Sequence, residues 1–257
     1  LQYLAMRIVG GRRAEPHSYP WTVAILKHDR MHCGGAIITD RHVLSAGHCF
    51  KWDNASLMEV LIGLDNLDDM ANVEKRTISH VVIHEQFTST PVRDENDIAV
   101  ATLNRPILFS DTIVPICLPK KGQDFSTRMG TIVGWGRIGV EKSSSRVLLK
   151  ASLRILTDKQ CKDSKLAQHL KPTMMCAFSK GKDGCQGDSG GPFITFEPEG
   201  KYVQAGTYQV FFLNIFKYFM RVYSFVRWCT VEPYLFISFL FSSMISILCA
   251  CSKPKPF

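Results

Sequence analysis

The sequence holds 257 residues, enough for one large domain or two small ones. Apolar residues make up 46% of the chain and charged residues 21%, a balance that excludes an intrinsically disordered protein. The net charge of +8 comes without any dense run of Lys and Arg, so we expect no nucleic-acid partner.

Short runs rich in β-branched residues follow one another along the chain, separated by turn signals. We expect strands at residues 21–26, 81–83, 98–103 and 131–133. Such strands, without helical heptads or internal repeats, are typical of an all-β barrel or sandwich. A polar stretch from Leu118 to Thr127 is placed to join two halves. One helix is expected after Thr157, because Thr157 and Gln160 have the form of a capping box.

Nine cysteines are many for a cytosolic chain of this size. They are scattered instead of forming the close pairs of a zinc site, so they indicate disulfides and an oxidising compartment. The opening LQYLAM is too short for the apolar core of a signal peptide, and no small-residue cleavage site follows it. We therefore expect a secreted protein whose sequence here begins inside a longer precursor.

The composition changes abruptly after Gly206. All 18 glycines lie at or before that residue, whereas residues 207–257 hold nine of the 16 phenylalanines and a single acid, Glu232. Folds built on tight β-turns do not usually lose every glycine in their final fifth. We therefore treat residues 207–257 as a divergent tail, and an alternative coding end and a membrane element both stay open. Tyr234 to Cys251 is uncharged, but it is at the lower length limit for a membrane-spanning helix and contains four serines.

A serine flanked by glycines lies late in the chain, in the stretch GDSGGP around Ser189. A serine hydroxyl is a poor nucleophile at neutral pH and needs a base, most often a histidine. His48, in SAGHC, follows a strand-like run and adjoins a cysteine. Asp97, in NDIAV, heads an apolar run and is expected to be buried. The order His, Asp, Ser indicates a triad for nucleophilic catalysis.

Five stretches together resemble the trypsin-like serine proteases of the chymotrypsin family. They are Ile8-Val9-Gly10-Gly11, SAGHC, NDIAV, Gly134-Trp135-Gly136 and GDSGGP. The resemblance covers residues 8–206. It implies two antiparallel six-stranded β-barrels, at about residues 20–117 and 128–206, with the triad in the cleft between them. We expect the second barrel to be incomplete, because no closing strand of the family is recognisable after Gly206.

The resemblance implies a role for each member of the triad. Ser189 would attack the scissile carbonyl, and His48 would act as general base and then as general acid. Asp97 would hold the His48 ring in the right tautomer, and the backbone N–H groups of Gly187 and Ser189 would form the oxyanion hole. No cofactor and no metal ion is implied. The acid-rich loop from Asp65 to Glu74 lies where some relatives bind calcium, but its ligand spacing favours a solvated loop.

The resemblance also implies activation and specificity. Residues 1–7 would end a pro-segment, and cleavage after Arg7 by an activating protease would free the amine of Ile8. That ammonium would pair with the carboxylate of Asp188 and lock the surrounding loop. Asp183, at the base of the primary pocket, would select substrates with Arg or Lys at the cleaved bond.

The family's cysteines give further expectations. Its disulfides would join Cys33 with Cys49 and Cys161 with Cys176. Cys117 matches a cysteine that ties to a pro-region in many relatives, and Cys185 lacks its usual partner. One family bridge is absent at both ends, because Gly130 and Thr195 stand where its cysteines would be.

The sequence leaves two functions open. The first is an active, secreted, trypsin-like endopeptidase made as a zymogen, which acts on protein or peptide substrates with Arg or Lys. The second is a catalytically silent homologue that acts as a binding protein. The second is favoured by the pocket wall and the second-barrel closure that are missing after Gly206. There Gln209 replaces a serine that would seat Asp97, and Phe211 stands where a glycine keeps the pocket open.

Overall fold

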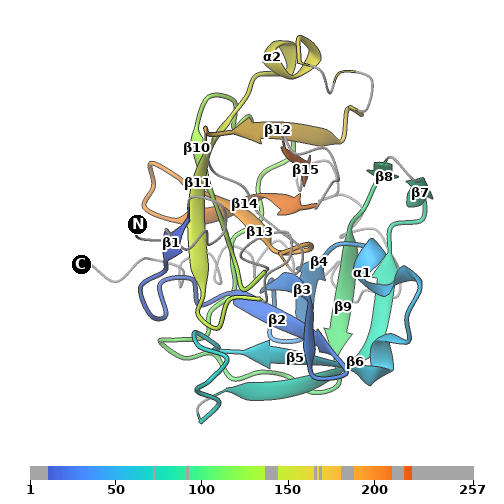
Figure 1. The fold of residues 1–257 in the computed structure, drawn as a ribbon, viewed down its shortest axis with the longest axis vertical. Coiled ribbons are helices and arrows are strands. Elements are labelled where there is room, and N and C mark those ends of the chain that lie inside the picture. Colours follow the sequence, from blue (N-terminus) through green and yellow to red (C-terminus); the bar gives the residue numbers. More distant parts are fainter. Residues whose placement is uncertain are drawn as a thin grey trace, which may run out of the picture.

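The computed structural model describes residues 11–71, 73–90, 93–136, 144–164, 167, 170–180, 188–209 and 217–221. Two antiparallel β-barrels make up most of these residues, and the helices are short (Figure 1). The predicted all-β class and the two-barrel architecture are confirmed.

The first barrel, called barrel one below, is a closed ring of strands in the order β2-β3-β4-β9-β6-β5. Its strands are β2 (Thr22–Lys27), β3 (Arg30–Ile37), β4 (His42–Ser45), β5 (Met58–Ile62), β6 (Glu74–Ile83) and β9 (Ala99–Leu103). Branched aliphatic side chains fill its interior: Val23, Ile25, Val60 and Val100 are fully buried. The strands expected at 21–26, 81–83 and 98–103 lie in β2, β6 and β9.

The second barrel, barrel two, has the order β11-β10-β13-β14-β15-β12, and β12 pairs back with β11. Its strands are β10 (Met129–Gly134), β11 (Leu149–Ile155), β12 (Met174–Phe178), β13 (Pro192–Phe196), β14 (Tyr202–Tyr208) and β15 (Lys217–Arg221). The two-residue strand β1 (Arg12–Arg13) adds to β11 from outside the ring.

The prediction of an incomplete second barrel is therefore wrong. The closing strand is β15, which lies in the supposed tail and pairs with both β14 and β12. A strand needs backbone partners and an apolar inner face, neither of which requires glycine. Phe219 and Met220 supply buried side chains, and the Arg221 guanidinium donates to the carbonyl of Met174 at 2.6 Å.

Aromatic packing occupies the place of the absent family bridge. Gly130 and Thr195 are direct partners across β10 and β13. A Cβ atom on Gly130 would lie 2.2 Å from the ring of Phe193, so that ring takes the space a larger residue would need. The same ring stacks on Phe219, with 4.0 Å between the centroids. The Phe193 ring of β13 thus fills the space beside Gly130 of β10, and its stacking on Phe219 joins β13 to β15.

The remaining elements of the described ranges are a hairpin and three short helices. They are β7 (Thr88–Thr90), β8 (Arg93–Glu95), α1 (His48–Lys51), the 3-10 turn η1 (Ala55–Leu57) and α2 (Asp158–Lys162). The predicted capping box is confirmed, because Thr157 and Gln160 exchange side-chain-to-backbone hydrogen bonds at the start of α2. Among the described residues, no helix has the length and apolar character to cross a membrane. Residues 234–251 lie outside the described ranges.

Candidate active site

The pairing of β4 with β9 brings His48 and Asp97 together. These strands are antiparallel neighbours, and Ser45 at the end of β4 lies opposite Ala99 at the start of β9. His48 follows β4 by three residues as the first residue of α1, and Asp97 precedes β9 by two. His48 and Asp97 are therefore adjacent because of the register between β4 and β9, although 49 positions separate them in the chain.

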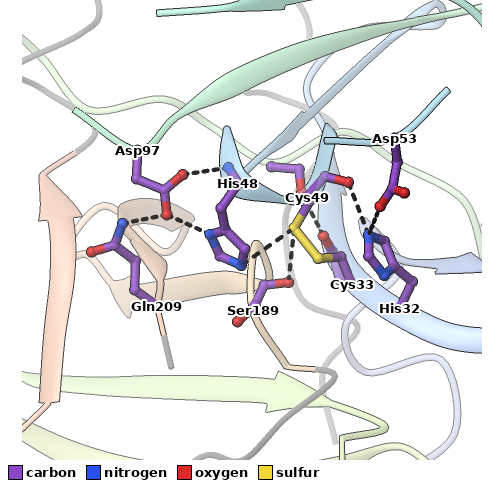
Figure 2. Close-up of a disulfide and its surroundings, with 10 residues drawn as sticks. His32, Cys33, His48, Cys49, Asp53, Asp97, Ser189 and Gln209 are labelled. Atoms are coloured by element: carbon purple, nitrogen blue, oxygen red, sulfur yellow. Dashed lines mark hydrogen bonds and ion pairs between the residues drawn. A yellow bond between two sulfur atoms is a disulfide. The ribbon is translucent and has the colours of Figure 1, made fainter. Parts of the chain in front are cut away.

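Two hydrogen bonds fix His48 on Asp97 (Figure 2). The His48 backbone N–H donates to Asp97 Oδ1 at 2.7 Å, and the Nδ1 atom of the ring lies 2.6 Å from Oδ2. Asp97 is fully buried. Because a carboxylate accepts hydrogen bonds, the proton of a neutral His48 ring is on Nδ1, which leaves Nε2 as the basic nitrogen.

The pKa of His48 is raised above its ordinary value of 6.5. Burial by itself would lower the pKa, but the charge of Asp97, the hydrogen bond that the His48 ring donates to Asp97 and the charge of Asp94 outweigh burial. An acid that stabilises the imidazolium is what a general base requires when it takes a proton.

Gln209, at the end of β14, supplies a third donor to Asp97. Its amide Nε2 donates to Asp97 Oδ2, and the side chain is buried. The replacement of the family's serine thus retains a hydrogen-bond donor on the carboxylate. Sequence reasoning identified this substitution but could not give the reach of the longer side chain.

Ser189 comes from barrel two and lies beside the ring of His48 (Figure 2). Its carbonyl accepts a hydrogen bond from the backbone N–H of Gly34 in β3 at 2.8 Å, which ties the turn to barrel one. Gly190 follows with φ of +81°, and a Cβ atom there would lie 2.2 Å from Ser45 Oγ. Only glycine permits this approach of the two barrels.

Asp188 is buried, and two glycines make room for its carboxylate. Gly136 N–H donates to Asp188 Oδ1 at 2.8 Å. A Cβ atom on Gly134 would lie 2.2 Å from the same oxygen, and one on Gly136 would lie 2.5 Å from the carboxylate. The Gly134-Trp135-Gly136 motif is therefore the wall against which Asp188 packs.

Several predicted site residues lie outside the described ranges. They are Arg7, Ile8, Asp183, Cys185, Gly187 and Phe211. The activation bond, the base of the substrate pocket and one donor of the oxyanion hole consequently stay predictions.

Both expected disulfides are present in the structure. Cys33 bonds to Cys49 beside His48, and Cys161 bonds to Cys176 between α2 and β12. Cys117 is buried and disulfide-bonded. The bond expected from Cys117 to a pro-region stays a prediction.

The candidate metal ligands are engaged in other bonds. In the loop from Asp65 to Glu74, acids form ion pairs with basic side chains: Asp65 with His17, Asp68 with Arg146, and Glu74 with Arg76. Cys33 and Cys49 are joined to each other, and Asp97 accepts three N–H groups.

One acid near the site was missed by sequence reasoning. Single side-chain atoms of His48, Asp94 and Asp97 all lie within 4.8 Å of one another. Asp94 lies three positions before Asp97, in Asp94-Glu95-Asn96-Asp97. This closeness in sequence to Asp97 was the signal that could have placed Asp94 near the site.

Comparisons with known proteins agree with this geometry. The sequence model of the Trypsin family matches residues 8–228 and so continues past Gly206. Serine protease filzig of Drosophila melanogaster is 36% identical over 215 residues, which cover 78% of this chain and 13% of that protein. Transmembrane protease serine 11C of Mus musculus is 34% identical over 205 residues, with 78% and 46% covered. Proclotting enzyme of Tachypleus tridentatus is 35% identical over 219 residues, with 78% and 58% covered. The chain spans less than two thirds of each of these relatives.

Proposed function

This chain belongs to the trypsin family of serine proteases, and from that premise we propose that it is a secreted endopeptidase that hydrolyses peptide bonds after Arg or Lys. The observation that carries the proposal is the fixed His48 ring. Its Nδ1 atom is bound to a buried carboxylate, and Ser189 lies beside it (Figure 2).

In the proposed reaction, Ser189 Oγ attacks the scissile carbonyl while Nε2 of His48 takes the hydroxyl proton. His48 then gives that proton to the leaving amine, and water repeats the sequence to release the acyl group. Asp97 keeps the proton of the neutral ring on Nδ1 and stabilises the imidazolium that forms. Backbone N–H groups of Gly187 and Ser189 would stabilise the negative charge on the substrate oxygen.

The reaction requires a neutral His48 in the free enzyme. Since the pKa of His48 is raised by Asp97 against the effect of burial, activity should fall as the pH drops through that pKa. Above it, the ring is neutral and can accept the proton, so the acid limb of the rate profile reports His48.

Activation by cleavage after Arg7 is part of the proposal. The support is the burial of Asp188 against Gly134 and Gly136, since a buried carboxylate gains from a cationic partner such as the freed amine of Ile8. Asp183 would then receive the Arg or Lys side chain of the substrate. The disulfides Cys33–Cys49 and Cys161–Cys176 favour an extracellular location.

A catalytically silent binding protein is the alternative. One of its two grounds, an incomplete second barrel, no longer holds because β15 closes the ring. The other ground, Phe211 at a pocket position, stays untested. The hydrolysis experiment below separates the two functions.

The test is hydrolysis of matched peptide substrates that differ only in the residue before the cleaved bond: Arg, Lys, Phe or Asp. The full chain would be compared before and after cleavage at Arg7, with Ser189→Ala as the inactive control and Asp183→Ser as the specificity control. We expect turnover of the Arg and Lys peptides only after cleavage, lost in Ser189→Ala and shifted away from basic residues in Asp183→Ser. Soluble, correctly cleaved protein without turnover would make this chain a silent homologue.

A further inference from the structure

Asp94 is an acid at the active site that the proposed triad does not use. It lies in β8, opposite Ser89 of β7 in the antiparallel hairpin. The hairpin lies on the side of the molecule where α1 begins with His48 (Figure 1). Asp94 is partly buried.

The geometry brings two carboxylates to one imidazole. One atom each from His48, Asp94 and Asp97 lies within 4.8 Å of the other two. Asp97 is already committed, because its oxygens accept two bonds from His48 and one from Gln209. Asp94 therefore adds a second negative charge near the ring, at a distance where charges in a partly buried site interact appreciably.

We propose that Asp94 is a further acidic positioning residue of the active site, whose carboxylate stabilises the protonated ring of His48 as it forms in the transition state. The proposal rests on the proposed function of His48 as general base. It acts through His48 and requires no contact between Asp94 and the substrate.

The other charges around the hairpin do not compete for Asp94. Its neighbours in β8, Arg93 and Glu95, pair with each other, and Lys171 lies 3.4 Å from Glu95. On the other side of the His48 ring are the neutral disulfide of Cys49 and, beyond it, His32 facing Asp53 at 3.8 Å. Within the part of the chain that the structure describes, the charges that act on the pKa of His48 are those of Asp97 and Asp94, and both raise it.

The surroundings of Asp94 disfavour its charged form. Burial, followed by the charge of Asp97, raises the pKa of Asp94, while the bond from Ser89 and the charge of His48 lower it. Two carboxylates held close together repel each other unless a cation forms between them. The imidazolium of the transition state is that cation, so the Asp94 charge is favourable when His48 is protonated.

Loss of the Asp94 charge should change both the height of the pH profile of kcat/KM and the position of its acid limb. Loss of the Asp94 charge removes stabilisation of the imidazolium, so the plateau of kcat/KM should fall about twofold to fivefold. The same loss lowers the pKa of His48, so the acid limb of the profile should move to lower pH. A merely structural role for Asp94 would lower the plateau without moving the limb.

The experiment measures the titration of the His48 ring by NMR in the full chain carrying Ser189→Ala, with the His48 signal assigned by its loss in His48→Gln. Asp94→Asn removes the charge and keeps the shape, and Asp94→Glu restores the charge. Glu95→Gln is the matched control in the same strand. We expect Asp94→Asn to lower the pKa of His48, Asp94→Glu to restore it, and Glu95→Gln to leave it unchanged.

Equal titration of His48 in the parent and in folded Asp94→Asn would overturn the proposal. Ser89→Ala separates charge from hydrogen bonding, because it keeps the Asp94 carboxylate and should keep the pKa of His48 raised. The titration needs no turnover, so it decides the role of Asp94 even if the chain hydrolyses nothing. In an active chain, the pH profiles of kcat/KM with Ser189 intact add the rate effect.

Discussion

Barrel one and barrel two have the same number of strands but fill their interiors with different side chains. Barrel one is packed with branched aliphatic residues such as Val23, Ile25 and Val60. Barrel two adds a cluster of rings to its aliphatic residues, with Phe193 stacked on Phe219 and Tyr208 tilted against Phe219. The architecture is therefore set by strand pairing and inner volume, and different side-chain chemistries can satisfy it.

The site depends on both barrels in unequal ways. Barrel one contributes His48 and Asp97 from the adjoining ends of two paired strands. Barrel two contributes Ser189 from a turn and Gln209 from the end of β14. The base and its carboxylate thus belong to the aliphatic barrel, and the nucleophile to the aromatic one.

The largest expected effect comes from the barrel-one carboxylate. Asp97→Asn should lower kcat about 10⁴-fold, the magnitude known for this substitution in the family, because an amide favours the wrong tautomer of His48. The measurement is kcat with the arginyl peptide. Unfolding in denaturant, compared with the parent, controls for stability. A loss smaller than tenfold would mean that Asp97 does not orient the base.

The next effect tests the aromatic closure of barrel two. Phe219→Ala should lower the free energy of unfolding by about 3–5 kcal/mol, because it removes the ring stacked on Phe193 and leaves a cavity. Denaturant unfolding measures the loss. Met129→Ala, at an exposed position in β10, is the control and should change stability by less than about 0.5 kcal/mol. Equal losses in the two variants would show that β15 does not hold the barrel closed.

A smaller effect sharpens the comparison at the absent bridge. Gly130→Ala should cost about 1–3 kcal/mol, because its Cβ would press on the Phe193 ring. Shortening that ring with Phe193→Leu should remove most of the extra cost of Gly130→Ala. A double-mutant cycle of unfolding free energies measures this coupling. Simple additivity would contradict the close packing of the ring on the glycine.

The smallest effect is a pH dependence of barrel one. Burial lowers the pKa of His42 below 6.5 in the folded protein and the charge of Arg41 adds to this, although the charge of Asp40 raises it. The unfolded chain therefore binds more protons in the interval between the two pKa values. The contribution of neutral His42 to the free energy of unfolding is therefore fully present above pH 6.5. It declines as the pH falls toward the pKa that His42 has in the folded protein.

His42→Gln removes that titration, so we expect the variant to lose less stability than the parent between pH 7.5 and pH 5.5. Denaturant midpoints at the two pH values measure the difference. The same change in denaturant midpoint between the two pH values in parent and variant would show that His42 does not contribute to the loss of stability at acid pH.

The sequence predicted what depends on short motifs. His48, Asp97 and Ser189 each lie in a distinctive stretch of sequence, and the capping box at Thr157 is a local interaction. Predicting the triad residues and the capping box therefore needed no knowledge of the fold. Cys33 and Cys49 could be paired because the resemblance supplied their positions. The capping box and the two disulfides are confirmed because local chemistry or a motif determined them, whereas the catalytic roles of His48, Asp97 and Ser189 stay predictions.

What failed depends on distant pairing. β15 has no motif of its own, and its identity as a strand comes from partners in β12 and β14 that the sequence does not mark. Asp94 approaches His48 only because the β7–β8 hairpin turns it toward α1. Composition also misled, because the loss of glycine after Gly206 concealed an ordinary strand.

The closure of barrel two by β15 also sets an order of events during synthesis. Barrel one is complete once residue 103 has left the ribosome, whereas the second ring waits for Arg221. At ordinary translation speeds this interval lasts on the order of ten seconds. A nascent chain therefore passes through a stage that has the base and its carboxylate but no nucleophile in place, and the apolar strands of its second half lack their closing partner until β15 arrives.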